Sequence, residues 1–197
     1  MNIKKIIEFK LEQFKELGIE EQSNGTILIG KALHVAPLAW LHTIFKGLNN
    51  AELSKLESKL DTDIPIEYKA FLKQTNGLHL FNTSFNLFGL RETYNRNSEL
   101  ENRLPFSLST KNTIEKPLNV PEEYFIIGSY DWDGSNLYID KSTNKVYRSE
   151  KGSVKALNEW ANLHEMISFE LDRLISQHNK DGTEINTTEP KTPRASS

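Results

Sequence analysis

The fold is decided by residues 49–77, which read NNAELSKLESKLDTDIPIEYKAFLKQTNG. Asn49 followed three residues later by Glu52 has the form of a capping box, so it predicts the start of a helix. That helix would end near residue 60, with an apolar stripe made of Leu53, Leu56 and Leu60. Pro65 suits the first turn of a second helix, because an N–H group there would be unpaired in any case. The inner face of this second helix would carry Tyr68, Phe71, Leu72 and Thr75, and Asn76-Gly77 would end it.

Downstream of residue 77 the pattern changes from helical to extended. Residues 85–90 and 124–127 are apolar runs of strand length, and residues 136–140 alternate polar and apolar side chains. Residues 141–144, KSTN, have the length and polarity of a hairpin loop, which predicts a partner strand over residues 145–149. The polar stretch between residues 91 and 120 reads as a long loop or insertion, and connections of that length are usually functional or mobile.

The two ends of the chain differ in character. Residues 2–17 place apolar side chains on one helical face ahead of Gly18, and residues 26–29 have the pattern of a short strand. Residues 33–45 are apolar without a regular period, and Pro37 interrupts them. A closing helix is predicted over residues 162–177, with Asn162 and Glu165 at capping spacing. Residues 179–197 contain only one large apolar side chain, so a disordered tail is expected.

These elements predict an α+β domain, a mostly antiparallel β-sheet packed by helices, with an N-terminal helix and a disordered C-terminal tail. The 197 residues fit about one domain. Lys and Arg total 24 against 27 Asp and Glu, which argues against direct binding of nucleic acid. Cysteine is absent, so disulfides and cysteine metal sites are excluded. No apolar run follows the basic N-terminus, so we expect a cytoplasmic protein that does not enter a membrane.

The sequence contains no recognisable catalytic motif. The five histidines lack the spacing of metal ligands, and His164-Glu165 has no second histidine four residues on. No nucleophile elbow, phosphate-binding loop or dinucleotide-binding glycine pattern occurs. We therefore predict no catalytic residues, no metal and no cofactor, and this silence favours a binding protein over an enzyme.

One suggestive cluster is YDWDGSN, residues 130–136. Asp131 and Asp133 before a glycine resemble the start of a calcium loop, in which alternating residues supply oxygen ligands. The glycine comes too early, however, and Ser142 stands where a bidentate glutamate would close the site. The same residues form a good turn, because Asp and Asn bond to nearby backbone and Gly accepts positive φ. The turn is the favoured interpretation.

The same cluster could instead bind a partner. Trp132 between two aspartates has the composition of an aromatic hot spot with an acidic rim. The equally weighted alternative is that Trp132 covers the end of the core, as large aromatic residues often do. The candidate partner-binding residues are therefore Tyr130, Asp131, Trp132 and Asp133, together with Glu122 and Glu123, which could deepen the negative patch or be ordinary surface.

Several of these residues carry a resemblance to a known family. The spacing of Leu53, Leu56-Glu57 and Leu60, followed by Ile64-Pro65, Glu67-Tyr68, Phe71-Leu72 and Asn76-Gly77, is similar to the signature of the SUKH superfamily. Its largest branch is the Smi–Knr family, named for a yeast regulator of cell-wall synthesis. The run Phe125-Ile126-Ile127-Gly128-Ser129, followed by Asp131, Gly134 and Asn136-Leu137-Tyr138, resembles the central strands of that family.

The resemblance implies a SUKH-like domain over residues 48–178, with residues 1–47 as an N-terminal helix and extension packed on it and residues 179–197 as the tail. It implies a non-enzymatic immunity protein that binds and neutralises a cognate polymorphic toxin, frequently a nuclease. The alternative is a regulatory scaffold that binds endogenous cell-wall or signalling proteins. A metal-assisted hydrolase using Asp131, Asp133 and a histidine is a third interpretation. The loop from residue 94 to 112 is a further candidate for the partner surface.

Overall fold

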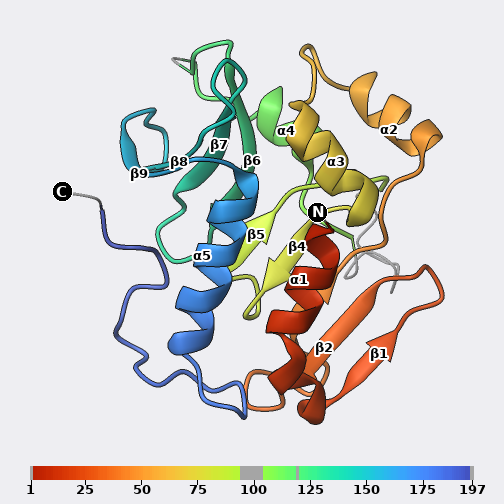
Figure 1. Cartoon of the computed structure of the whole chain (residues 1–197), viewed down its shortest axis with the longest axis vertical. Coiled ribbons are helices and arrows are strands. Elements are labelled where there is room, and N and C mark those ends of the chain that lie inside the picture. Colours follow the sequence, from red (N-terminus) through yellow and green to blue (C-terminus); the bar gives the residue numbers. More distant parts are fainter. Residues whose placement is uncertain (1, 94–103, 119, 196–197) are drawn as a thin grey trace.

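Nine antiparallel strands form a single sheet in which each strand pairs with the next one along the chain. The computed structural model describes residues 2–93, 104–118 and 120–195 (Figure 1). The strands are β1 Ile19–Glu21, β2 Ile27–Lys31, β3 Trp40–Ile44, β4 Leu78–Leu80, β5 Phe85–Leu87, β6 Tyr124–Tyr130, β7 Asn136–Asp140, β8 Val146–Ser149 and β9 Ala156–Trp160. The α+β class and the antiparallel sheet are therefore confirmed.

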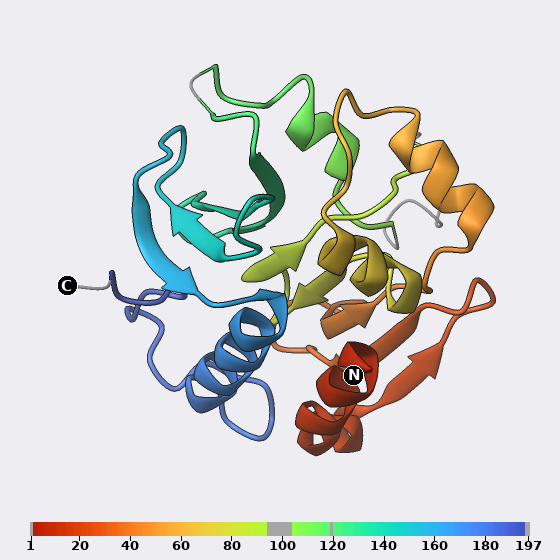
Figure 2. The same cartoon turned by 45° about the horizontal axis from the view of Figure 1, so that its top comes forward.

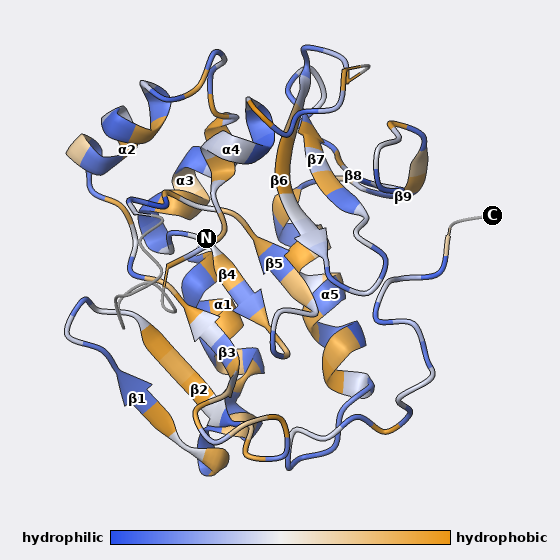
Figure 3. Ribbon diagram, turned by 180° about the vertical axis from the view of Figure 1, so that it is seen from behind, coloured by the Kyte–Doolittle hydropathy of each residue, from blue (hydrophilic) through white to orange (hydrophobic). Residues whose placement is uncertain are grey.

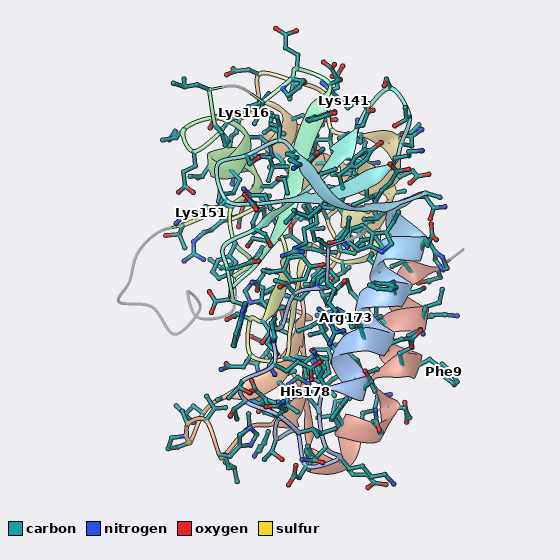
Figure 4. The ribbon with its side chains drawn as sticks, turned by 90° about the vertical axis from the view of Figure 1, so that its left-hand side faces the viewer. Phe9, Lys116, Lys141, Lys151, Arg173 and His178 are labelled. Carbon is teal, nitrogen blue, oxygen red and sulfur yellow. The ribbon has the colours of Figure 1, made fainter. Side chains whose placement is uncertain are left out.

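The helices are divided between the two faces of this sheet. They are α1 Ile3–Lys10, the 3₁₀ helix η1 Glu12–Leu17, α2 Asn50–Glu57, α3 Ile66–Gln74, α4 Leu108–Asn112 and α5 Leu163–Ser176. Helices α1, α3 and α5 cover one face, while the short α4 lies on the other (Figures 1 and 4). The sheet curls around α1, α3 and α5, and its two edge strands, β1 and β9, lie on opposite sides of the molecule (Figure 2).

The two helices predicted within residues 49–77 are confirmed. The Asn49 side chain accepts a hydrogen bond from the Glu52 N–H, and the Glu52 carboxylate accepts one from the Asn49 N–H, which completes the capping box. Pro65 is the N-cap of α3. The hydroxyl of Tyr68 on α3 lies 2.6 Å from the Phe88 carbonyl oxygen and 2.9 Å from that of Ile127, so it bonds the helix to the chain on both sides of the β5–β6 pairing.

The N-terminal residues belong to the same core as the rest of the chain. Ile7, Leu11 and Phe14 are fully buried within one hydrophobic cluster that also contains the inner residues of α3 and α5. Figure 3 shows the concentration of hydrophobic residues in β2 and β6, at two well-separated places in the sheet. The helix predicted over residues 2–17 breaks at Leu11, where η1 takes over, so that Phe14 still points inward.

Two buried asparagine side chains each bond to both the N–H and the carbonyl oxygen of one backbone residue, as a residue of a paired strand does. Asn76 donates to the Leu90 carbonyl at 2.9 Å and accepts from the Leu90 N–H at 2.6 Å. Asn112 makes the same pair with Ile126, at 2.7 and 2.8 Å. Asn76 thereby fixes the end of α3 to the chain beyond β5, and Asn112 fixes α4 to β6.

Replacing Asn76 by alanine is expected to lower the free energy of unfolding by about 2–4 kcal/mol, because both buried polar groups of Leu90 lose their partners. Urea unfolding of the purified chain measures this. Asn50→Ala, in the exposed first turn of α2, is the matched control and should change stability by less than about 0.5 kcal/mol. An Asn76→Ala loss as small as that of the control would mean that water replaces the amide.

The segment predicted as a long loop, residues 91–120, contains α4 and a bridge between Gly89 and Ser107. The side chain of Ser107 caps α4 by accepting from the Thr110 N–H. The helix has only five residues, too few for a visible apolar period, which is why the sequence does not reveal it. The candidate partner loop over residues 94–112 lies mostly outside the described residues.

The C-terminal segment, residues 179–195, corrects the prediction of a disordered tail. Lys191 is 3% exposed and Thr192 is 8% exposed. The carbonyl oxygens of Lys191 and Pro193 accept hydrogen bonds from Arg173 and Arg148. The prediction was wrong because it considered only apolar side chains, whereas this segment is held mainly by its backbone carbonyls.

Candidate functional site

Residues 131–135, here called the Trp132 turn, join β6 to β7. The Tyr130 N–H bonds to the Ser135 carbonyl oxygen at 3.0 Å, and the Gly134 N–H bonds to the Tyr130 carbonyl oxygen at 3.1 Å. Gly134 has φ +68°, a conformation that favours glycine. The Asp133 carboxylate accepts from the Ser135 N–H at 2.9 Å. These bonds are those of a tight turn, which is the interpretation favoured from the sequence.

Arg148 on β8 holds this turn in place. Its guanidinium donates to the Asp133 carboxylate at 2.6 Å, to the Ser135 hydroxyl at 3.0 Å and to the Asn158 side chain at 3.0 Å. Partial burial opposes ionisation of Asp133, but hydrogen bonds from Ser135 and Arg148 outweigh it and lower the pKa of Asp133. The Asp133 carboxylate therefore helps to hold the turn in its conformation, through its bonds to Ser135 and Arg148.

Trp132 remains at the surface of this fixed turn. Its side chain is 48% exposed, and Asp131 and Asp133 on either side of it are also exposed. If Trp132 only covered the end of the core, its side chain would be mostly buried, but about half of its surface is exposed. The exposed half is held on a rigid turn, which lowers the entropy cost of using it in a contact.

A cavity of about 250 Å³ opens beside Trp132. Separate parts of the chain form its walls: the β2–β3 loop with Leu41 of β3, the β4–β5 turn, the Trp132 turn, and the residues that follow α5. The polar and charged wall residues include His34, Asn82, Ser84, Asp131, His178, Glu184 and Lys191. Lys191 is buried and lies 3.2 Å from Glu184, so the two charges largely compensate each other.

Val35 and Trp132 place exposed apolar surface at the edge of the cavity. Val35, on the β2–β3 loop, lines the cavity with its side chain 48% exposed. Leu33 and Leu38 on the same loop are exposed still further, as is Ile185 in the C-terminal segment, but these three side chains do not line the cavity. Exposed apolar side chains at the edge of a polar hollow are typical of a protein-binding surface. From the sequence, this loop appears only as part of the apolar stretch of residues 33–45, which has no regular period.

The β4–β5 turn contributes a strained wall. Phe81, Asn82 and Thr83 are consecutive residues with positive φ, at 47°, 50° and 72°. This conformation is costly for non-glycine residues and is common at functional sites. The turn is held by the Ser84 hydroxyl, which donates to the Phe81 carbonyl at 2.8 Å, and by the ring of Phe81, which stacks on His178 at 4.0 Å.

The predicted site residues do not all come together. Asp131, Trp132 and Asp133 share one surface, but Tyr130 is buried with its ring against Phe85 and Arg148, so it supports the turn from inside. Glu122 and Glu123 are exposed just before the start of β6, whereas Trp132 follows its end. A strand of seven residues separates them by roughly 20 Å, so they do not extend the acidic rim.

A buried histidine lies behind the strained turn. His42 on β3 is fully buried between Phe14 and Phe81, and its Nδ1 lies 3.4 Å from the Phe81 N–H. Burial, and secondarily the charge of His178, lower the pKa of His42 to about 3. Burial also lowers the pKa of His178. Both rings therefore favour the neutral form in the folded chain.

Stability should consequently fall as the pH drops. The unfolded chain protonates His42 near pH 6.5, while the folded chain resists to about pH 3, so acid favours the unfolded state across this window. The expected loss from His42 alone is about 2 kcal/mol between pH 8 and pH 5. Urea unfolding at both pH values, for the parent and for His42→Phe, measures it. The variant should lose about 2 kcal/mol less than the parent, and an equal loss would show that the buried ring does not cause the effect.

Two further features bear on the chemistry of the described part of the chain. It contains no group of three or more histidine, aspartate or glutamate side chains that could hold a metal ion. None of its helices has the length and apolar character required to cross a membrane.

One family of known proteins matches the central part of the chain. The SMI1 / KNR4 family (SUKH-1) matches residues 47–168, which run from the start of α2 into α5 and include the Trp132 turn. A comparison with curated proteins finds no match. Strands β1 to β3 and the C-terminal segment lie outside the matched region, although the β2–β3 loop, Leu41 of β3 and the C-terminal segment contribute to the cavity walls. The match extends over more than half of the sequence, and the chain belongs to the SMI1 / KNR4 (SUKH-1) family.

Proposed function

We propose that this chain is a non-enzymatic immunity protein that binds a cognate toxin and blocks it. Membership of the SUKH-1 family is consistent with this role. The observation that carries the proposal for this chain is Trp132, a large aromatic side chain that stays 48% exposed on a turn fixed by buried hydrogen bonds. An exposed aromatic residue on a rigid support has the properties of a binding hot spot.

The binding surface we propose, called the Trp132 surface, consists of Asp131, Trp132, Asp133 and Val35. Asp131 gives it negative charge beside an apolar centre, whereas the charge of Asp133 is paired with that of Arg148. A toxin that cuts nucleic acid needs a basic cleft to hold phosphates, and this surface is complementary to such a cleft. Charge would accelerate the encounter, whereas burial of Trp132 would set the lifetime of the complex. The mechanism would be occlusion of the toxin's active site.

Co-expression with the toxic domain encoded beside this gene tests the function. Cells should survive only when both proteins are present, and the two should co-purify as a stable complex. A neighbour that is harmless alone, or that kills despite this protein, would refute immunity for that pair. In that case the scaffold alternative would be pursued by isolating endogenous partners.

A further inference from the structure

Residues 190–194 lie in a groove whose side chains bond to backbone carbonyl oxygens. Gln177 donates to the Pro190 carbonyl at 3.1 Å, and Arg173 donates to that of Lys191 at 2.8 Å. Arg148 donates to the Pro193 carbonyl at 2.8 Å, and Asn158 donates to that of Arg194 at 2.6 Å. We call Arg148, Asn158, Arg173 and Gln177 the carbonyl groove. They come from β8, β9 and the C-terminal end of α5, and the segment runs beside these elements (Figures 2 and 4).

The donors of the groove are fixed by partners other than the segment. Arg148 is held by Asp133 and Ser135, as described for the Trp132 turn. Arg173 donates through two of its nitrogens to Glu170, a fully buried carboxylate on the same helix. Arg173 also donates to the Gln177 side-chain oxygen at 3.1 Å, which leaves the Gln177 nitrogen directed at Pro190. Because the donors are already oriented, little side-chain freedom is lost when an occupant arrives.

The carbonyl groove itself bonds to the backbone of the occupant. The side chain of Arg194 is exposed, and its carbonyl oxygen bonds to the groove. Lys191 is buried, and its ammonium group bonds to Glu184 and to the Asn186 carbonyl oxygen, which precede residues 190–194 and are not part of the groove. Residues 187 and 188, which precede the groove-bound residues, are exposed. They tether the segment and raise its effective concentration at the groove.

We propose that the carbonyl groove is a binding site for a peptide segment, and that the chain's own residues 190–194 occupy it in cis. Its prearranged donors are directed at the carbonyl oxygens of residues 190, 191, 193 and 194, and they match a peptide that bends as this segment does at Lys191 and Thr192. The tether, rather than unusual affinity, keeps the chain's own segment in place. The same segment supplied as a separate peptide should therefore compete for the groove. This inference does not depend on the immunity function.

The test uses the full chain with a protease recognition sequence inserted between the exposed Thr187 and Thr188. The folded protein is cleaved, and a fluorescent peptide of residues 188–197 is titrated into it while anisotropy is measured. The peptide should bind saturably and should displace the original fragment, as detected by mass spectrometry after native gel filtration. Arg148→Met should weaken binding at least about 10-fold, because it removes a charged donor, and Gln177→Leu should weaken it less.

Two altered peptides distinguish backbone recognition from side-chain recognition. A peptide with Arg194→Ala should bind within about 2-fold of the parent, since that side chain has no bond to the groove. A peptide with an ester in place of the amide between residues 193 and 194 should bind several-fold more weakly, because an ester carbonyl is a poorer acceptor.

Three results would overturn the proposal. The first is a cleaved chain that stays folded by circular dichroism but neither retains the fragment nor binds the peptide. The second is unfolding of the chain when the fragment leaves, which would make residues 190–194 part of the folding unit and not a ligand. The third is unchanged peptide binding in both Arg148→Met and Gln177→Leu.

Discussion

Replacing Gly128 by alanine is expected to destabilise the folded chain by about 3 kcal/mol or more. Gly128 lies in β6 beside β5, and a Cβ atom there would be 2.3 Å from the Asn86 carbonyl oxygen and 2.9 Å from a methyl group of Leu87. The register of β6 against β7 also shifts between Ile126 and Gly128, so the backbone is already bent at this point. The carbonyl belongs to a strand in the middle of the sheet and cannot move away without breaking the β5–β6 pairing.

Thermal and urea unfolding of Gly128→Ala measure this loss. Gly152→Ala is the matched control, because Gly152 has φ +72° but no atom lies within 4 Å of its added Cβ. The control should cost only about 1–2 kcal/mol, from backbone conformation alone. Equal losses in the two variants would show that β5 and β6 can separate to accept a methyl group.

Replacing Trp132 by alanine is expected to weaken toxin binding by at least about 2 kcal/mol, which is roughly 30-fold in Kd. The indole is the largest exposed side chain at the rim of the cavity and is held on the Trp132 turn. The fold should survive the change, because the turn depends on Asp133, Ser135 and Arg148 and not on the indole. Calorimetric titration with the purified toxic domain measures the affinity.

Phe9→Ala is the control for this experiment. Phe9 on α1 is also an exposed aromatic side chain, it points away from the sheet, and it does not line the cavity (Figure 4). Its removal should leave affinity within about 2-fold. Unfolding of Trp132→Ala would assign the indole to the core, and an equally tight complex would remove it from the binding surface.

Much of the fold could be predicted from the sequence because its signals are local. The capping box of Asn49 and Glu52, the cap at Asn162, and the hairpin between β7 and β8 all depend on residues within a few positions of one another. Strands β1 and β4 gave no such signal, because three residues each are too few to establish an alternating pattern. Strand β5 is equally short, but it lies within the apolar run of residues 85–90 that predicted it.

The candidate site was only partly predictable. The composition of residues 130–136 pointed to Trp132 and its two aspartates, and these do share one surface. The sequence left open whether Glu122 and Glu123 extend the negative patch or are ordinary surface, because it does not show that β6 separates them from Trp132 by its full length. The cavity could not be predicted from the sequence, because separate segments between residue 34 and residue 191 form its walls.

Periodicity and capping within short stretches were enough to predict the helices capped by Asn49 and Asn162 and the antiparallel character of the sheet. Other features depend on contacts between parts of the chain that are distant in sequence. Asn76 bonds to Leu90, fourteen residues away, and Arg148 bonds to Pro193, forty-five residues away. Neither bond can be predicted from neighbouring residues, because a side-chain amide or guanidinium donates to whichever carbonyl oxygen the folded chain brings within reach. A polar C-terminal segment therefore becomes ordered through contacts that its own composition does not encode.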